Sequence, residues 1–144
     1  MIEGTRQTTN QMGWRVATPA KIRVVIAEDH PVMRYTLRGF LKQYAEIEVV
    51  GEAANGQEAV LIAEALQADI VLMDINMPRL GGIAATRRIK ASSNRIAVIG
   101  LSVDGEGYSV SDMLSAGAVA VVPKERIAEE LYDAIQRAVA LLPK

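Results

Sequence analysis

Short apolar runs, rich in β-branched residues, recur along the chain from residue 22 onward. Each run is nearly continuous and too short for a helix, which is typical of strands buried on both faces. The second run carries acidic charges at Glu48 and Glu52, which suit a strand at the edge of a sheet. The pattern predicts strands at about 22–27, 47–53, 70–73, 96–101 and 118–122.

Stretches with helical periodicity follow these runs. After Pro31, which suits the first turn of a helix, apolar residues return at spacings of three and four and share one face. Helices are predicted at about 31–44, 55–66, 83–90, 108–115 and 127–142. Five strands that alternate with five helices imply a doubly wound α/β fold, with a parallel sheet covered by helices on both faces.

Local signals mark two of the helix starts. Asn55 can cap the second helix, and Glu58 three residues later completes a pair that resembles a capping box. Gly81 and Gly82 precede the third helix. We interpret them as a turn, because glycine permits backbone angles that other residues avoid.

Residues 1–20 show neither helical nor strand periodicity. They are predicted to form a flexible N-terminal extension, followed by one domain over residues 21–144. Trp14, the only tryptophan, is interpreted as a loosely packed residue of this extension rather than a docking anchor.

Composition excludes several classes of function. Sixteen basic and seventeen acidic residues leave a formal charge of -1, so no electrostatic signature of nucleic-acid or anionic-membrane binding is present. The absence of cysteine excludes disulfides, zinc–thiolate sites and thiol catalysis. No apolar stretch reaches the roughly 20 residues of a membrane span, and the start lacks a signal-peptide pattern. We expect a soluble, cytoplasmic protein.

Polar residues stand at the carboxyl ends of four predicted strands, where ligands bind in open α/β sheets. The second strand ends in Ala53 and Ala54, as expected at an edge, which gives the strand order 2-1-3-4-5. The convergent residues are Glu28 and Asp29 after strand one, Asp74 after strand three, Ser102 after strand four and Lys124 after strand five.

These residue types suit phosphoryl transfer to an aspartate. Three carboxylates repel one another unless a cation is present, and hard oxygen ligands suit Mg²⁺. A carboxylate can act as a nucleophile and form an acyl phosphate. The transferred group spreads its charge over three oxygens, which a metal, the hydroxyl of Ser102 and the ammonium of Lys124 would neutralise.

The same residues carry a family resemblance over about residues 21–142. The chain resembles response-regulator receiver domains of the CheY-like, flavodoxin-like fold, and most closely the NarL/FixJ subfamily, whose full-length members carry a LuxR-type output domain. The segments that carry it are Val25–His30, Asp69–Pro78, Gly81–Gly82, Leu101–Ser102 and Pro123–Lys124.

The resemblance implies a role for each matching residue. Asp74 would be the phosphoacceptor, Asp29 would bind Mg²⁺ directly and Glu28 would act through water. The backbone carbonyl of Asn76 would complete the metal ligands. Ser102 would be the switch hydroxyl and Lys124 the phosphate-binding lysine. The implied partner is a histidine kinase or a phosphotransfer protein, with a phosphorylation-dependent homodimer also implied.

Three positions depart from the family pattern. Val121 stands where receivers usually carry an aromatic residue that swings inward on activation. Val103 replaces a small residue after the switch hydroxyl and could restrict access to the acyl phosphate. Pro123 precedes the lysine, whereas the proline usually follows it, and it holds Val122 in extended geometry.

Other functions stay open at this stage. A degenerate receiver that serves as a dimerisation or docking module is supported only by Val103 and Val121. A haloacid-dehalogenase-like hydrolase would need a second aspartate where Asn76 stands, and a Rossmann enzyme would need a glycine-rich loop at 28–30. His30 is interpreted as a local contact of the carboxylates rather than a general base. We therefore expect a switch that assists its own phosphorylation, not a dedicated enzyme.

Overall fold

The computed structural model describes residues 5–9, 11–103 and 107–143. Its main sheet is parallel, with the order β4-β3-β5-β6-β7, which confirms the predicted order 2-1-3-4-5. The strands are β3 (Ile22–Ala27), β4 (Ile47–Ala53), β5 (Ile70–Asp74), β6 (Ala97–Ser102) and β7 (Ala120–Pro123). The predicted doubly wound α/β fold is therefore confirmed.

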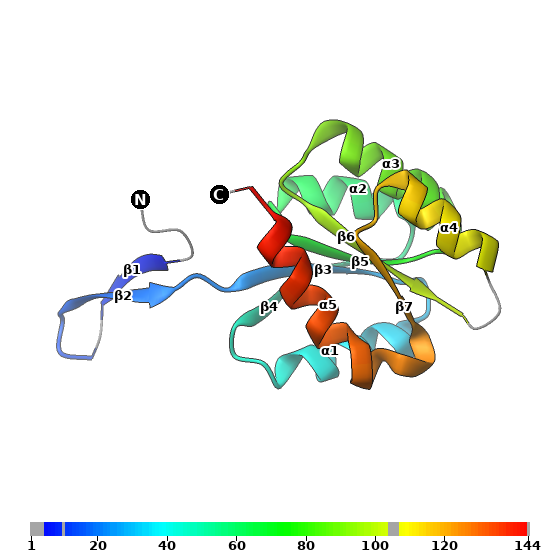
Figure 1. Cartoon of the computed structure of the whole chain (residues 1–144). Coiled ribbons are helices and arrows are strands. Elements are labelled where there is room, and N and C mark those ends of the chain that lie inside the picture. The colour runs from blue at the N-terminus through cyan, green and yellow to red at the C-terminus, as the bar shows by residue number, and fades with distance from the viewer. Residues whose placement is uncertain (1–4, 10, 104–106, 144) are drawn as a thin grey trace.

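Helices cover both faces of this sheet (Figure 1). They are α1 (Pro31–Lys42), α2 (Gly56–Ala65), α3 (Gly82–Ser92), α4 (Gly107–Ala116) and α5 (Ile127–Leu141), the last preceded by a 3₁₀ turn at Lys124–Arg126. The capping pair at α2 is as predicted, because the backbone N–H of Glu58 donates to Asn55 Oδ1 at 2.9 Å and Ala54 N donates to Glu58 Oε1 at 3.1 Å.

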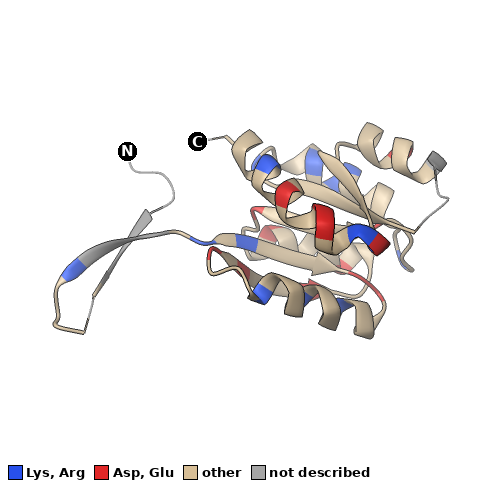
Figure 2. Ribbon diagram, turned by 60° about the horizontal axis from the view of Figure 1, so that its bottom comes forward, with Lys and Arg blue, Asp and Glu red and all other residues tan. Residues whose placement is uncertain are grey.

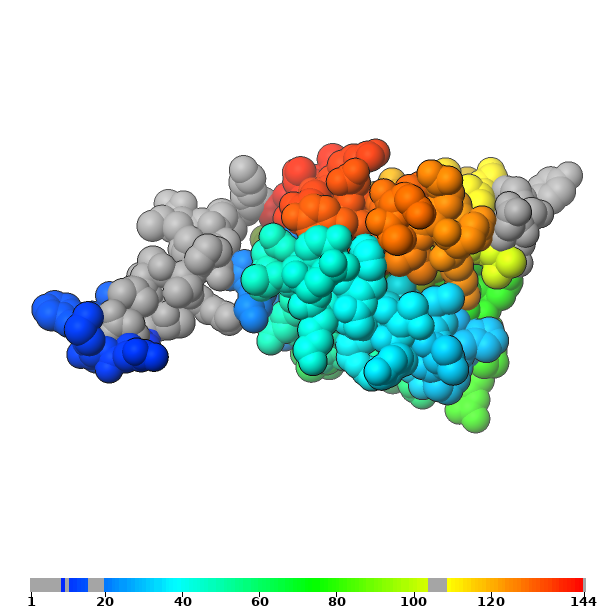
Figure 3. All heavy atoms as spheres, turned by 90° about the horizontal axis from the view of Figure 1, so that it is seen from below, coloured from blue at the N-terminus to red at the C-terminus, as the bar shows by residue number. Residues whose placement is uncertain are grey.

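Two hydrophobic cores follow from the alternation of side chains along each strand. Val24 and Ile26 of β3 pack with α1 and α5, whereas Val25 and Ala27 pack with α2, α3 and α4. On the first face α1 and α5 lie side by side, cyan and orange to red in Figure 3. The rings of Tyr44 and Tyr132 stack there with their centroids 4.2 Å apart.

Strand β5 is buried along its whole length, including Asp74 at its carboxyl end. Because β5 is the central strand, its last residue lies between the ends of β3 and β6. The fold thus places a carboxylate, 3% exposed, at the middle of one edge of the sheet.

An antiparallel hairpin precedes the main sheet. Its strands, β1 (Thr5–Thr9) and β2 (Arg15–Pro19), lie outside the two helix layers (Figure 1). The expectation that this region holds no strand was wrong. A two-stranded ribbon with few apolar residues gives no alternation to detect, and its turn depends on Gly13 at a φ of +84°. Trp14 is 67% exposed, as expected for a loosely packed residue.

None of the helices among the described residues combines the length and the apolar character needed to cross a membrane.

The glycine pair before α3 serves close packing rather than backbone freedom. The positive φ angles in this turn belong to Arg79 (50°) and Leu80 (85°), whereas Gly81 has a φ of −71°. A Cβ at Gly82 would lie 2.1 Å from the carbonyl oxygen of Asp74. Our explanation by unusual backbone angles was wrong for this pair, because at Gly82 the missing side chain lets α3 start against the end of β5.

Replacing Gly82 by alanine is expected to lower the free energy of unfolding by about 1–3 kcal/mol, because backbone must move to admit the methyl group. Gly39 is the matched control, since it is an exposed helical glycine where an added Cβ would meet nothing within 4 Å. Gly39→Ala should raise stability by about 0.5–1 kcal/mol. Urea unfolding of both variants measures this, and equal effects would contradict the packing role of Gly82.

Candidate functional site

Charged residues from three strands meet at the carboxyl edge of the sheet. Glu28 and Asp29 follow β3, Asp74 ends β5 and Lys124 follows β7. Figure 2 shows acidic segments and a basic segment at the end of the sheet where α1 begins. The convergence predicted from the strand ends is therefore observed for these four residues, which we call the acidic cluster.

Lys124 joins the two buried carboxylates. Its Nζ lies 3.1 Å from Glu28 Oε2 and 3.2 Å from Asp74 Oδ1. The side chain of Glu28 is completely buried, and that of Lys124 is 14% exposed. Partial burial acts to lower the pKa of Lys124, but its hydrogen bond to Glu28 and the charges of Asp74 and Glu28 together raise it. Lys124 is therefore a fixed cation inside the cluster.

Lys124 compensates the negative charge of Asp74 only in part. Burial, then the hydrogen bond and the repulsion from Glu28, raise the pKa of Asp74 to about 7, although Lys124 acts to lower it. The backbone N–H of Asn76 also donates to Asp74 Oδ1 at 3.3 Å. One lysine thus does not balance the carboxylates that surround it, and a further cation would stabilise the ionised form of Asp74.

His30 borders the cluster on its solvent side. Its Nδ1 lies 2.9 Å from Glu28 Oε1 and 3.2 Å from Asp29 Oδ1, which confirms the predicted local contact. The hydrogen bond to Glu28, with the charges of Asp29 and Glu28, raises the pKa of His30. Within the described part of the chain, Asp29 Oδ1 is a buried oxygen without a hydrogen-bond partner.

The cluster has the composition of a metal site. One ligand atom each from Glu28, Asp29, His30 and Asp74 lie within 4.8 Å of one another. Oxygen-rich sets of this kind suit hard divalent cations, which bind through one or two carboxylates and keep several waters. The residues present therefore fit the divalent ion expected from the sequence.

Ser102 and Asn76 stand beside the cluster. Ser102 ends β6, is 4% exposed and pairs in register with Pro123, the residue before Lys124. Asn76 follows Asp74 by two residues, and it is its backbone N–H that contacts the carboxylate. Their expected roles toward phosphate and metal stay predictions.

Sequence reasoning missed two contacts that hold Glu28 in place. Arg34 donates from its guanidinium to the carbonyl oxygen of Glu28 at 2.6 Å and lies 3.4 Å from Glu52. It also missed that Lys124 bonds to Glu28 as well as Asp74. The polar residues of α1 that face the sheet edge were the available signal for Arg34, but periodicity alone does not assign their partners.

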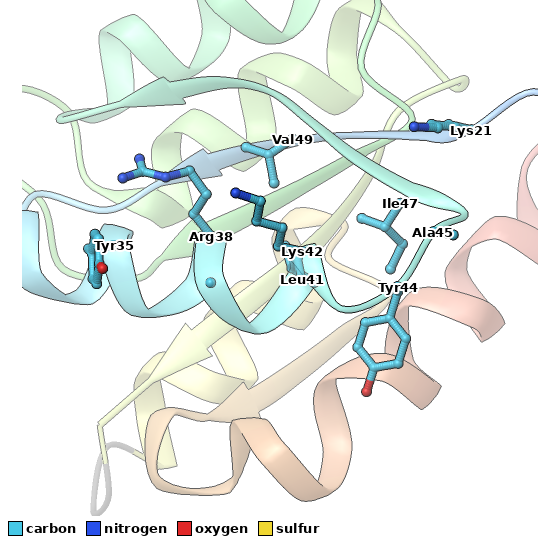
Figure 4. Close-up of a pocket in the computed structure, with 10 residues that line it drawn as sticks. Lys21, Tyr35, Arg38, Leu41, Lys42, Tyr44, Ala45, Ile47 and Val49 are labelled. Carbon is cyan, nitrogen blue, oxygen red and sulfur yellow. The ribbon is translucent and has the colours of Figure 1, made fainter.

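A separate groove lies between α1 and β4 (Figure 4). Lys21, Arg38 and Lys42 line it together with two tyrosines. Arg38 pairs with Glu52 and lies 5.6 Å from the centre of the Tyr35 ring. Among the described residues that line this groove there is no carboxylate, so they lack the groups needed to bind a metal or accept a phosphoryl group.

The family model for the response regulator receiver domain matches residues 24–136, which include every residue of the cluster. The chain belongs to the response regulator receiver domains. This result agrees with the strand order and with the position of Asp74 at the end of β5.

Two relatives of this receiver domain are named as transcriptional regulatory proteins. The chain is 39% identical over 119 residues to the regulatory protein YxjL of Bacillus subtilis, covering 82% of this chain and 54% of that protein. It is 38% identical over 125 residues to LiaR of the same species, covering 85% and 58%. The chain therefore spans about half the length of the curated relatives it matches.

Solved receiver domains share the fold. The response regulator domain of Thermotoga maritima CheB superposes with a TM-score of 0.77 at 31% identity, covering 85% of this chain and 99% of that one. The NarL receiver of Mycobacterium tuberculosis superposes with a TM-score of 0.74 at 28% identity, covering 82% of this chain and 98% of that one. A LuxR-family regulator from Aurantimonas superposes with a TM-score of 0.78 at 30% identity, covering 84% of this chain and 86% of that one. The predicted likeness to the NarL and LuxR-type receivers is confirmed.

Without metal, the raised pKa of Asp74 makes stability depend on pH. The pKa of Asp74 is about 7 in the fold and 3.8 ordinarily. Its contribution to the free energy of unfolding is therefore complete below about pH 4 and is lost as the pH rises through 7. Asp74→Asn should remove this loss. In EDTA the free energy of unfolding of the variant is therefore expected to exceed that of the original chain by about 1–2 kcal/mol at pH 8 and by less at pH 5. Asp133→Asn, on an exposed face of α5, is the control.

Urea unfolding at the two pH values measures the difference. An advantage of Asp74→Asn that is equal at pH 5 and pH 8 would contradict the assignment of the charge penalty to Asp74.

Proposed function

We propose that the chain is a phosphorylation switch of a two-component phosphorelay, in which Asp74 accepts a phosphoryl group in a Mg²⁺-dependent reaction. The observation that carries this proposal is the contact of Lys124 Nζ with both Asp74 and Glu28 at 3.1–3.2 Å. It sets the acceptor carboxylate beside a fixed cation and beside two further carboxylates able to hold a metal.

Asp74 would act as the nucleophile. One of its carboxylate oxygens attacks the phosphorus of a partner's phosphohistidine, the P–N bond breaks, and an acyl phosphate forms while the imidazole leaves. Lys124 is already 3.2 Å from Asp74 Oδ1, so it can contact a phosphoryl oxygen without crossing the site. The hydroxyl of Ser102 would donate to a second oxygen, since Ser102 ends the strand next to β5.

Four groups would hold Mg²⁺. Asp29 and Asp74 supply direct carboxylate ligands, the backbone carbonyl of Asn76 a third, and Glu28 a contact through water. Bound there, the ion neutralises charge on the phosphoryl oxygens. The burial of Glu28 behind Lys124 supports an indirect role, because its two oxygens already accept from the ammonium.

The output would be a change of protein contacts. Histidine kinases or phosphotransfer proteins are the partners of receiver domains, and here we propose one of them as the phosphoryl donor in the cytoplasm. Phosphorylation would shift an existing equilibrium at a surface formed by α4, β7 and α5, with a homodimer as one outcome. Since the relatives are named as transcriptional regulators, we propose a role in transcription regulation, with no nucleic acid bound by this chain itself.

A degenerate docking module is the second candidate. Val121 packs partly buried against the α4 side of the sheet, where a receiver usually carries a mobile aromatic residue. This alternative needs no phosphorylation, so the same experiment distinguishes the two.

Incubation with acetyl phosphate and Mg²⁺ should produce a phosphoryl adduct, detected by intact mass. The adduct should disappear in EDTA and in Asp74→Asn, because either change removes a reacting group or its cation. Asp133→Asn, which removes an exposed carboxylate of α5, should keep it. A folded chain that forms no adduct with several small donors would contradict the switch and favour the docking module.

Val103 is expected to slow loss of the phosphoryl group. Its side chain is 51% exposed directly after Ser102, where it can restrict the approach of water to the acyl phosphate. Val103→Ala should shorten the lifetime of the adduct several-fold, whereas Val119→Ala, a partly exposed valine before β7, should leave it unchanged. Equal lifetimes for both variants and the original chain would eliminate this role.

A further inference from the structure

His30 turns toward the carboxylates rather than toward its own helix. It occupies the N-cap position of α1 in extended geometry, yet its side chain makes no capping hydrogen bond. Instead Nδ1 approaches two different carboxylates, Glu28 and Asp29. The ring is 70% exposed, so these contacts, rather than close packing, determine its orientation.

The spacing of His30 Nδ1 and Asp29 Oδ1 matches that of neighbouring ligands on one metal ion. Ligands bound at about 2.1 Å with angles near 90° lie about 3.0 Å apart. Nδ1 of His30 lies 3.2 Å from Asp29 Oδ1, whereas its 2.9 Å contact with Glu28 Oε1 is a hydrogen bond. One ligand atom of Asp74 falls within 4.8 Å of all three, so the set also includes the phosphoacceptor.

Asp29 lacks a hydrogen-bond donor for one of its oxygens. Its Oδ1 is a buried atom that accepts no hydrogen bond among the described residues, although His30 Nδ1 approaches it at 3.2 Å. A carboxylate oxygen buried without a donor is costly, and a metal ion bound to both this oxygen and His30 would satisfy it. Glu28 is in a different position, because Lys124 already donates to both of its oxygens. The side-chain ligands are then best taken as Asp29, Asp74 and His30, beside the backbone carbonyl of Asn76.

We propose that His30 is a nitrogen ligand of this metal site and gives it a preference for divalent transition ions over Mg²⁺. The proposal rests on the proposed function, since it concerns the ion at the same site. Imidazole is a good ligand for Co²⁺, Ni²⁺ and Zn²⁺, whereas Mg²⁺ prefers oxygen ligands and keeps its waters. The exposed edge of the ring leaves room for waters or phosphoryl oxygens at the other coordination positions.

The single histidine of the chain makes a direct test available. In the untagged protein, the imidazole protons give one set of NMR signals, and paramagnetic Co²⁺ bound through Nδ1 should shift them strongly. Mg²⁺ should compete for the same site and reverse the shift only at much higher concentration. Isothermal titration with Co²⁺ and with Mg²⁺ gives the two affinities.

His30→Asn is the informative variant, because asparagine is a favourable N-cap and the position is exposed, so folding should be retained. The expected result is a loss of Co²⁺ affinity of about tenfold or more, with a smaller loss for Mg²⁺, so that the preference between the ions falls. Asp29→Asn should weaken both ions.

The outcomes separate this inference from the proposed function. Mg²⁺ binding at the carboxylates without a Co²⁺-induced shift of the histidine signals, or equal losses for both ions in His30→Asn, would overturn the role of His30 and leave the phosphorylation switch intact. No binding of either ion to the folded chain would contradict the metal site itself, and with it the Mg²⁺ dependence of the switch.

Discussion

One ammonium group connects the parts of the molecule that matter for its chemistry. Lys124, at the end of β7, contacts Glu28 from the end of β3 and Asp74 from the end of β5. The three residues are far apart in sequence, and the parallel sheet brings them to one edge. A buried carboxylate needs a partner, so this lysine makes it possible to hold Glu28 and Asp74 together. It does not balance Asp29 as well, and the remaining negative charge is what suits the site to a cation and an incoming phosphoryl group.

The rest of the fold maintains this geometry. Strand β5 is buried on both faces, which fixes the backbone that carries Asp74. Gly82 lets α3 begin directly against the carbonyl of Asp74, and the two cores hold the helices on either side. A metal ion bound by His30 and the acyl phosphate on Asp74 would share one small region, so metal choice and phosphoryl transfer are two properties of the same residues.

Much of this could be predicted from the sequence, because it depends on periodicity and on where strands end. Continuous apolar runs gave the strands, and the residues that follow them gave Glu28, Asp29, Asp74 and Lys124. The N-terminal hairpin could not be predicted, since its strands contain few apolar residues and leave no alternation to detect. The role of Gly82 was misjudged because steric room depends on a neighbour distant in space, and Arg34 was missed because hydrogen-bond partners across elements are set by the packed fold.

The central claim is that the fold assembles three carboxylates with too little positive charge, so that a divalent ion completes the site. The most direct measurement is the stability of the chain against urea as Mg²⁺ is added, compared with that of Asp29→Asn. The account predicts that saturating Mg²⁺ stabilises the original chain by about 1–3 kcal/mol, following the ratio of ion concentration to its dissociation constant, and stabilises Asp29→Asn much less. Equal stabilisation of both proteins, or none of the original chain, would contradict it.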